Sequence, residues 1–128
     1  MLTIRHPQIA ALPTDPEQDA AFVRWAVGHL RRSCPRQSAA LGDDELRRRA
    51  EAGLRRARRA GFSEPELVAD FLELMVRQAP DFDEHPAVRR ALRRAVPRRL
   101  ILLSLCAAVD ADAWTEIRAA SDPSAWET

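Results

Sequence analysis

The chain has 128 residues, with 20 basic side chains against 19 acidic ones and a net charge of +1. One domain is expected at this length, because domains cluster near about 100–150 residues. The basic residues are all arginine, and the near-neutral balance excludes a uniformly basic nucleic-acid-binding protein. The composition, 46% hydrophobic and 30% charged, excludes a disordered tail and a collagen-like repeat.

Residues 1–12 lack the apolar run of about 7–15 residues that a signal peptide needs. The longest apolar run, residues 100–109, is about half as long as a bilayer-spanning helix and predicts a buried helix instead. The two cysteines, Cys34 and Cys106, have neither the density of a disulfide scaffold nor a metal-binding spacing. We therefore expect a cytoplasmic protein with reduced, buried thiols and no membrane partner.

The first predicted helix follows a short N-terminal arm, residues 1–13. In the segment Thr14-Asp15-Pro16-Glu17, a capping side chain precedes a proline at the first helical position. The helix should end before Pro35, because the residue preceding a proline is disfavoured in the α region. Its apolar stripe has i, i+3, i+4, i+7 spacing and consists of Val23, Ala26, Val27 and Leu30.

Two longer helices are predicted next. The acidic residues 43–45 begin one of them, at the end where the helix dipole favours negative charge, and Gly61 suits its C-terminal end. Gly53 lies on its apolar face and would let a neighbouring helix approach closely. A capping box of Ser63 and Glu66 predicts the start of the other helix. That helix is apolar on most sides, so it should lie at the centre of the fold.

Shorter elements complete the chain. The acidic turn 81–85 should lead into a short helix over residues 86–95, and a further helix should run over residues 97–109. An aspartate, Asp110 or Asp112, should cap the last helix.

The fold class predicted from these elements is all-α, since no segment alternates apolar and polar residues over the length of a strand. We expect a compact single-domain bundle of five to six helices over residues 1–128. Residues 121–128 are expected to form a flexible tail.

The charges are arranged in blocks along the sequence. Residues 47–59 hold seven arginines and one glutamate, a net charge of +6. Residues 63–84 hold seven acids and one arginine, a net charge of −6, and residues 86–99 hold six arginines, a net charge of +6. The near-neutral total is therefore a cancellation between segments.

Two interpretations of these blocks stay open. The basic helices can neutralise the acidic central helix within the fold, through exposed ion pairs worth less than about 1 kcal/mol each. Alternatively, an arginine face binds an acidic partner, because guanidinium groups match carboxylates and phosphates in bidentate geometry. A protein is favoured over nucleic acid, since no aromatic residues interleave with the arginines and no nucleic-acid-binding signature is present. The candidate partner-binding residues are Arg47, Arg48, Arg55, Arg59, Arg89, Arg90, Arg93 and Arg94.

The sequence offers no constellation of residues for catalysis. The four glycines are scattered singly, so no phosphate-binding loop is indicated. His29 lies near the apolar stripe of the first helix and is expected to be a core histidine with satisfied hydrogen bonds. The cluster of Asp81, Asp83, Glu84 and His85 lacks the glycine and the oxygen ligands of a calcium loop, and we interpret it as helix-capping residues. We expect no catalytic residue, metal, cofactor or small-molecule substrate.

Several short motifs carry a family resemblance through their order and spacing. They are Met1-Leu2-Thr3-Ile4-Arg5, Gln8, His29-Leu30-Arg31, Cys34-Pro35, Leu41-Gly42, Gly53-Leu54-Arg55-Arg56-Ala57, Gly61-Phe62, Phe71-Leu72-Glu73-Leu74-Met75 and Asp81-Phe82-Asp83. Over roughly residues 1–95, the chain resembles a family of short bacterial proteins encoded beside type VI secretion spike and effector genes. It departs from their pattern at Gln78-Ala79-Pro80, where a glycine is expected, and it lacks a tryptophan after Pro86.

This resemblance implies an accessory role toward a secreted toxin, and it brings no catalytic residues with it. The expected function is that of a non-enzymatic helical adaptor or chaperone, which binds a co-encoded secreted effector or spike component of a bacterial type VI secretion system. An immunity protein that neutralises a co-encoded toxin is the first alternative. A small nucleic-acid-associated regulator is the second.

Overall fold

A computed structural model describes residues 15–94 and 97–127 of the chain, and the predicted arm lies outside them. Every regular element in these two ranges is helical, which confirms the all-α fold class. The α-helices (α) and 3₁₀ turns (η) are α2 (Pro16–Ser33), α3 (Pro35–Ser38), α4 (Asp43–Arg59), α5 (Pro65–Arg77), η2 (Phe82–Glu84), α6 (Pro86–Leu92), α7 (Arg98–Ala108), α8 (Ala111–Ala119) and η3 (Pro123–Glu127). The number of helices exceeds the prediction because a single-turn helix, α3, follows α2 directly.

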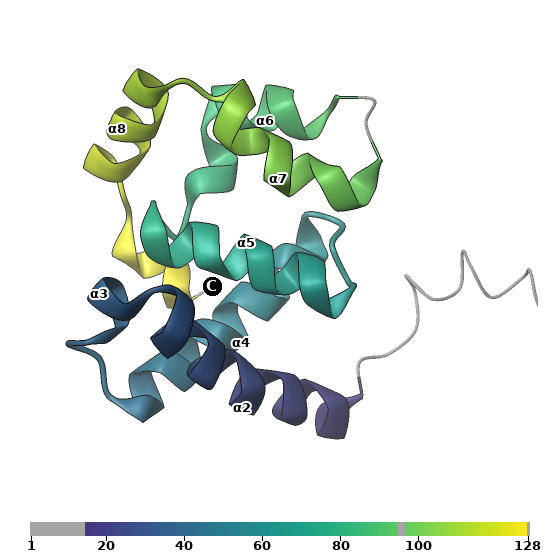
Figure 1. The fold of residues 1–128 in the computed structure, drawn as a ribbon, viewed down its shortest axis with the longest axis vertical. Coiled ribbons are helices and arrows are strands. Elements are labelled where there is room, and N and C mark those ends of the chain that lie inside the picture. Colours follow the sequence, from purple (N-terminus) through teal and green to yellow (C-terminus); the bar gives the residue numbers. More distant parts are fainter. Residues whose placement is uncertain (1–14, 95–96, 128) are drawn as a thin grey trace, which may run out of the picture.

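Helix α5 crosses the middle of the molecule, with α2 and α4 on one side and α6 and α7 on the other (Figure 1). One hydrophobic cluster joins α5 to α4, α6, α7 and α8 and includes Phe71 and Phe82, whose ring centroids lie 4.9 Å apart. A second cluster joins α5 to α2 and α4 and includes Leu30 and Leu72, which are fully buried. The central position expected for this helix is therefore confirmed.

Helices α4 and α5 approach closely at Gly53. A Cβ atom added to this glycine would lie 2.5 Å from Cδ1 of Leu72, a distance that side chains do not tolerate. The small residue predicted to allow close packing thus does so, and it does so against the central helix.

Several helix ends follow the local signals in the sequence. The carboxylate of Asp15 accepts a hydrogen bond from the backbone N–H of Glu17 at 2.9 Å, and α2 ends directly before Cys34 and Pro35. Gly61, just after α4, has a φ of 95°, which is in the left-handed region that favours glycine. The carboxylate of Asp110 caps α8 by accepting from the backbone N–H of Ala113 at 2.8 Å.

Two local expectations are wrong. The capping box of Ser63 and Glu66 does not form, because Pro65 takes the first helical position and the N-cap position falls on Glu64. Residues 121–127, expected to be part of a flexible tail, instead contain η3 and pack against α4. The apolar ring of Trp126 provides the physical reason, since it is half-buried against both hydrophobic clusters.

Candidate functional site

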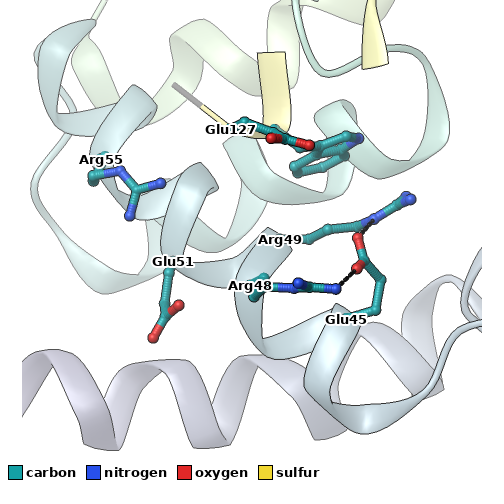
Figure 2. Close-up of a pocket in the computed structure, with 7 residues that line it drawn as sticks. Glu45, Arg48, Arg49, Glu51, Arg55 and Glu127 are labelled. Carbon is teal, nitrogen blue, oxygen red and sulfur yellow. Dashed lines mark hydrogen bonds and ion pairs between the residues drawn. The ribbon is translucent and has the colours of Figure 1, made fainter. Parts of the chain in front are cut away.

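The arginines at the start of α4 have acidic partners one helical turn away. The guanidinium of Arg47 lies 3.3 Å from the carboxylate of Asp44. Glu45 accepts hydrogen bonds from Arg48 and, at 3.0 Å, from Arg49 (Figure 2). The hydrogen bonds from Arg49 and Arg48 lower the pKa of the Glu45 carboxyl below its ordinary value. The acids of the first turn thus neutralise much of the charge on this part of the helix.

A shallow hollow of about 320 Å³ lies beside these pairs, between α4 and η3. The guanidinium of Arg49 lies 5.0 Å from the ring centroid of Trp126, within the range of a cation–π interaction. Arg55 lines the same hollow and forms no ion pair with any described residue. The lining residues are Glu45, Arg48, Arg49, Glu51, Arg55, Trp126 and Glu127 (Figure 2), so both acids and arginines surround it.

The arginines on the inner side of α4 are paired with distant acids. Arg56 is buried and binds Asp83 through Nε at 2.7 Å and Glu84 through Nη2 at 2.5 Å. Arg58 donates two hydrogen bonds, at 2.7 and 3.0 Å, to the carboxylate of Asp19 in α2. Internal neutralisation therefore holds for these residues of α4, although the acids come from α2 and η2 rather than from the central helix α5.

The arginines of α6 and of the turn that follows this helix differ from those of α4. Arg89, Arg90, Arg93 and Arg94 are all exposed, and their side chains form no hydrogen bond or ion pair with any described residue. Helical residues follow each other about 100° apart, so the first three lie within about 100° of arc. The opposite side of α6 is buried through Val88.

A second hollow, of about 330 Å³, lies between α6 and the corner where α7 meets α8. Arg90 lines it from α6 and Arg94 from the turn after this helix. Its other lining residues are Ala87, Ala91, Ala108, Asp110 and Ala113. The carboxylate of Asp110 caps α8 instead of pairing with an arginine. The hollow therefore combines small apolar residues with two guanidinium groups and the helix-capping carboxylate of Asp110. The two guanidinium groups outnumber this one carboxylate, so the hollow suits a further carboxylate.

The predicted arginine set thus divides in two. Arg47 and Arg48 have acidic partners on their own helix. The side chains of Arg55 and Arg59 are exposed further along α4. Arg89 and Arg90 of α6 and Arg93 and Arg94, which directly follow this helix, are all exposed. We call this set of four residues the α6 arginine face. The α6 arginine face is the better candidate for partner binding, because it contains no acid.

The most organised polar arrangement elsewhere involves His29, which was expected in the core. Its Nε2 lies 2.6 Å from the carboxylate of Glu73, and its ring stacks on the exposed ring of Trp25 with centroids 4.6 Å apart. The histidine is thus half-buried at the surface rather than in the core. The reason is that its ring contacts Trp25 of its own helix, α2, and Glu73 of α5. The hydroxyl of Ser33 donates to the backbone carbonyl of His29 and not to the ring.

The acidic cluster 81–85 combines the predicted helix capping, by His85, with a second role for its acids. Its acids Asp83 and Glu84 hold the buried Arg56, while His85 caps α6 through Nδ1, which accepts from the backbone N–H of Ala87 at 3.1 Å. Within the ranges that the structure describes, no group of three or more potential ligands could hold a metal ion. The sequence could not indicate the Arg56 pairing, because 27 residues separate Arg56 from Asp83.

Comparisons with protein-family models, with curated proteins and with solved structures find no match to this chain. Among the helices of residues 15–94 and 97–127, none has the length and apolar character needed to cross a membrane.

Proposed function

We propose that this protein is a non-enzymatic helical adaptor or chaperone that binds an acidic segment of another protein through the α6 arginine face. The observation that carries the proposal is the contrast between two basic helices. Arginines of α4 bind acids within the fold, whereas the four residues of the α6 arginine face are exposed to solvent with no acidic partner among the described residues.

Physical chemistry favours an acidic protein segment at this face. Four like charges on a short helix repel one another, and bound carboxylates relieve this repulsion. Guanidinium groups can hold carboxylates in bidentate geometry, and Arg90 and Arg94 already line a hollow. Because the face is exposed, its charges act over a screening length of about 8 Å at physiological salt. The attraction should therefore weaken as salt is added.

The resemblance to proteins encoded beside type VI secretion genes supports the choice of partner. On this basis the partner is a secreted effector or a spike component whose gene adjoins the gene of this protein. The protein then acts in the cytoplasm, where it holds the effector or loads it onto the secretion spike.

Co-purification tests the proposal. The tagged protein is co-expressed with the untagged products of the adjacent genes, as the wild type and as the quadruple variant Arg89→Gln, Arg90→Gln, Arg93→Gln, Arg94→Gln. We expect the wild type to retain one neighbouring product at low salt and the variant to retain at least about tenfold less, a change of 1.4 kcal/mol or more in binding.

A second quadruple variant, Arg47→Gln, Arg48→Gln, Arg55→Gln, Arg59→Gln, serves as the control. It removes the same charge from α4 and should retain the neighbouring product, provided that circular dichroism shows both variants folded. Equal retention by wild type and both variants, or retention of no neighbour at all, would contradict the proposal.

Two further measurements separate the alternatives. Rescue of cells that express a neighbouring toxin would assign an immunity role, whereas a chaperone raises only the level or export of that protein. Binding to a fluorescent oligonucleotide that falls steeply with salt would instead assign a nucleic-acid-associated role.

A further inference from the structure

The solvent-facing side of α7 is apolar. Leu103 is 74% exposed and Leu100 is 44% exposed, and Ala107 is exposed on the same side. These positions have i, i+3, i+7 spacing, so they lie within about 60° of arc. They form a stripe about 10 Å long, since a helix rises 1.5 Å per residue. We call this set of three residues the α7 stripe.

The opposite side of α7 already supplies the core. Ile101, Leu102 and Leu105 are buried, and Leu105 is fully so. A surface helix normally has a polar side opposite its buried side, and α7 departs from this pattern at the α7 stripe. Apart from Leu100 and Leu103, Trp25 is the one large hydrophobic residue exposed in the ranges that the structure describes.

The α7 stripe adjoins the α6 arginine face. Helices α6 and α7 pack against each other, and Figure 1 shows them side by side on the same side of α5. The hollow beside them is lined by Arg90 from α6, by Arg94 just after this helix and by Ala108 from α7. Ala108 is about 80° around the helix from Leu100. The surface thus passes from cationic to apolar over the width of two helices.

We propose that this combined surface binds an amphipathic acidic helix of the partner. The apolar side of that helix covers the α7 stripe, with anchors at i, i+3 or i+4, and i+7. Its carboxylates meet the α6 arginine face, and one of them enters the hollow between Arg90 and Arg94. This inference rests on the proposed function and specifies the shape and chemistry of the segment that is bound.

Charge complementarity favours an acidic helix over two other possible occupants of this surface, which are a second copy of the chain and a lipid bilayer. A second copy of the chain that bound through the same surface would bring the two α6 arginine faces close together, and their positive charges would repel. A lipid bilayer is disfavoured because α7 exposes no aromatic residue among its described side chains to anchor at a membrane interface. An acidic helix satisfies both the charge and the concave shape.

Two synthetic peptides of about 16 residues, long enough to form a helix, provide the test. Both have the same leucine, glutamate and alanine composition and capped ends. One places leucines at i, i+3, i+7 with glutamates on the adjoining side, and the other distributes the same residues without a helical face. We expect the amphipathic peptide to bind in fluorescence anisotropy at least about tenfold more tightly than the scrambled one.

Variants assign the binding to the surface. The double variant Leu100→Gln, Leu103→Gln should bind the amphipathic peptide at least about tenfold more weakly than the wild type does. The quadruple arginine variant Arg89→Gln, Arg90→Gln, Arg93→Gln, Arg94→Gln should bind both peptides more weakly. Trp25→Gln is the matched control, because it removes an exposed apolar side chain on α2, and it should leave binding unchanged.

The outcomes distinguish this inference from the proposed function. If the arginine variant weakens binding while the leucine variant has no effect, the amphipathic-helix inference is wrong and the acidic-partner proposal stands. If neither peptide binds with a dissociation constant below about 1 mM, the inference is also wrong. Co-purification alone then decides the proposed function. Binding of phosphatidylglycerol vesicles that requires Leu100 and Leu103, without peptide binding, would identify the surface as a membrane contact and overturn the inference.

Discussion

Arg56 differs from the other arginines of α4 in being buried. Only 8% of its side chain is exposed, and both of its hydrogen-bonding partners, Asp83 and Glu84, come from η2. Burial of a guanidinium is costly unless carboxylates compensate for its lost hydration. This one residue therefore fixes the acidic turn against α4.

Replacing Arg56 by methionine should destabilise the fold by about 2–4 kcal/mol. Removal of one partner from a buried ion pair typically costs about 3–5 kcal/mol, and the half-exposed Glu84 moderates the loss. Urea unfolding followed by circular dichroism measures the change. The exposed neighbour gives the control, since Arg55→Met should stay within about 0.5 kcal/mol of the wild type; similar losses in both variants would contradict the assigned role of Arg56.

The pair of Asp19 and Arg58 predicts a pH dependence of stability. The hydrogen bonds from Arg58 lower the pKa of the Asp19 carboxyl in the folded state. A depressed carboxyl pKa stabilises the fold fully above the unfolded value of about 3.9, and this contribution is lost as the pH falls through the lower folded value.

The variant Asp19→Asn should therefore cost up to about 1 kcal/mol at pH 7, since both side chains are partly exposed. The free energy of unfolding, measured by urea titration between pH 7 and pH 2, should converge with that of the wild type at the acidic end. A difference that persists unchanged at pH 2 would mean that the charge of Asp19 is not its source.

At the scale of helices, two glycines should respond to alanine in opposite directions. In Gly53→Ala the new methyl group collides with Leu72, and overpacking costs about 1–3 kcal/mol. In Gly28→Ala the new methyl group meets the end of the flexible Arg32 side chain at 3.2 Å. Alanine is favoured over glycine within a helix by up to about 1 kcal/mol, so this variant should be neutral or stabilised.

Thermal unfolding of the two glycine variants measures this difference. Both variants replace a glycine within an α-helix by alanine, so helix propensity alone predicts equal shifts of the unfolding midpoint. A lower midpoint for Gly53→Ala together with an unchanged or higher midpoint for Gly28→Ala supports the close α4–α5 contact. Equal shifts would contradict it.

Helix boundaries were predictable where the residue that sets the boundary lies in the same helical turn. Asp15 and Asp110 cap the helices as predicted, and Pro35 ends α2. Ser63 was wrongly predicted as a cap, because two local signals place the N-cap at different residues. The capping box places it at Ser63, whereas Pro65 at the first helical position places it at Glu64. The packing of η3 could not be predicted, since it depends on where Trp126 meets α4 in space.

At the scale of the whole molecule, the charge blocks in the sequence indicated two basic surfaces, and the structure distinguishes them. The pairs that Asp44 and Glu45 form with arginines of α4 have i, i+3 and i, i+4 spacing, so they are local to the helix. The pairs of Arg56 and Arg58 join residues 27 to 39 positions apart, and such pairs follow from the tertiary fold. The stretch 86–94, which has no acid, was the sequence signal for the α6 arginine face.

The central position of α5 also has a consequence for the dynamics of the protein. Helix α5 contributes Phe71 to one hydrophobic cluster and Leu72 to the other. Detachment of α5 would therefore expose both clusters to solvent at the same time. Neither cluster can then persist alone, and the described helices form one cooperative unit instead of two subdomains. The backbone amides of α5 should accordingly exchange with solvent only through global unfolding, so their slow hydrogen exchange reports the stability of the whole fold.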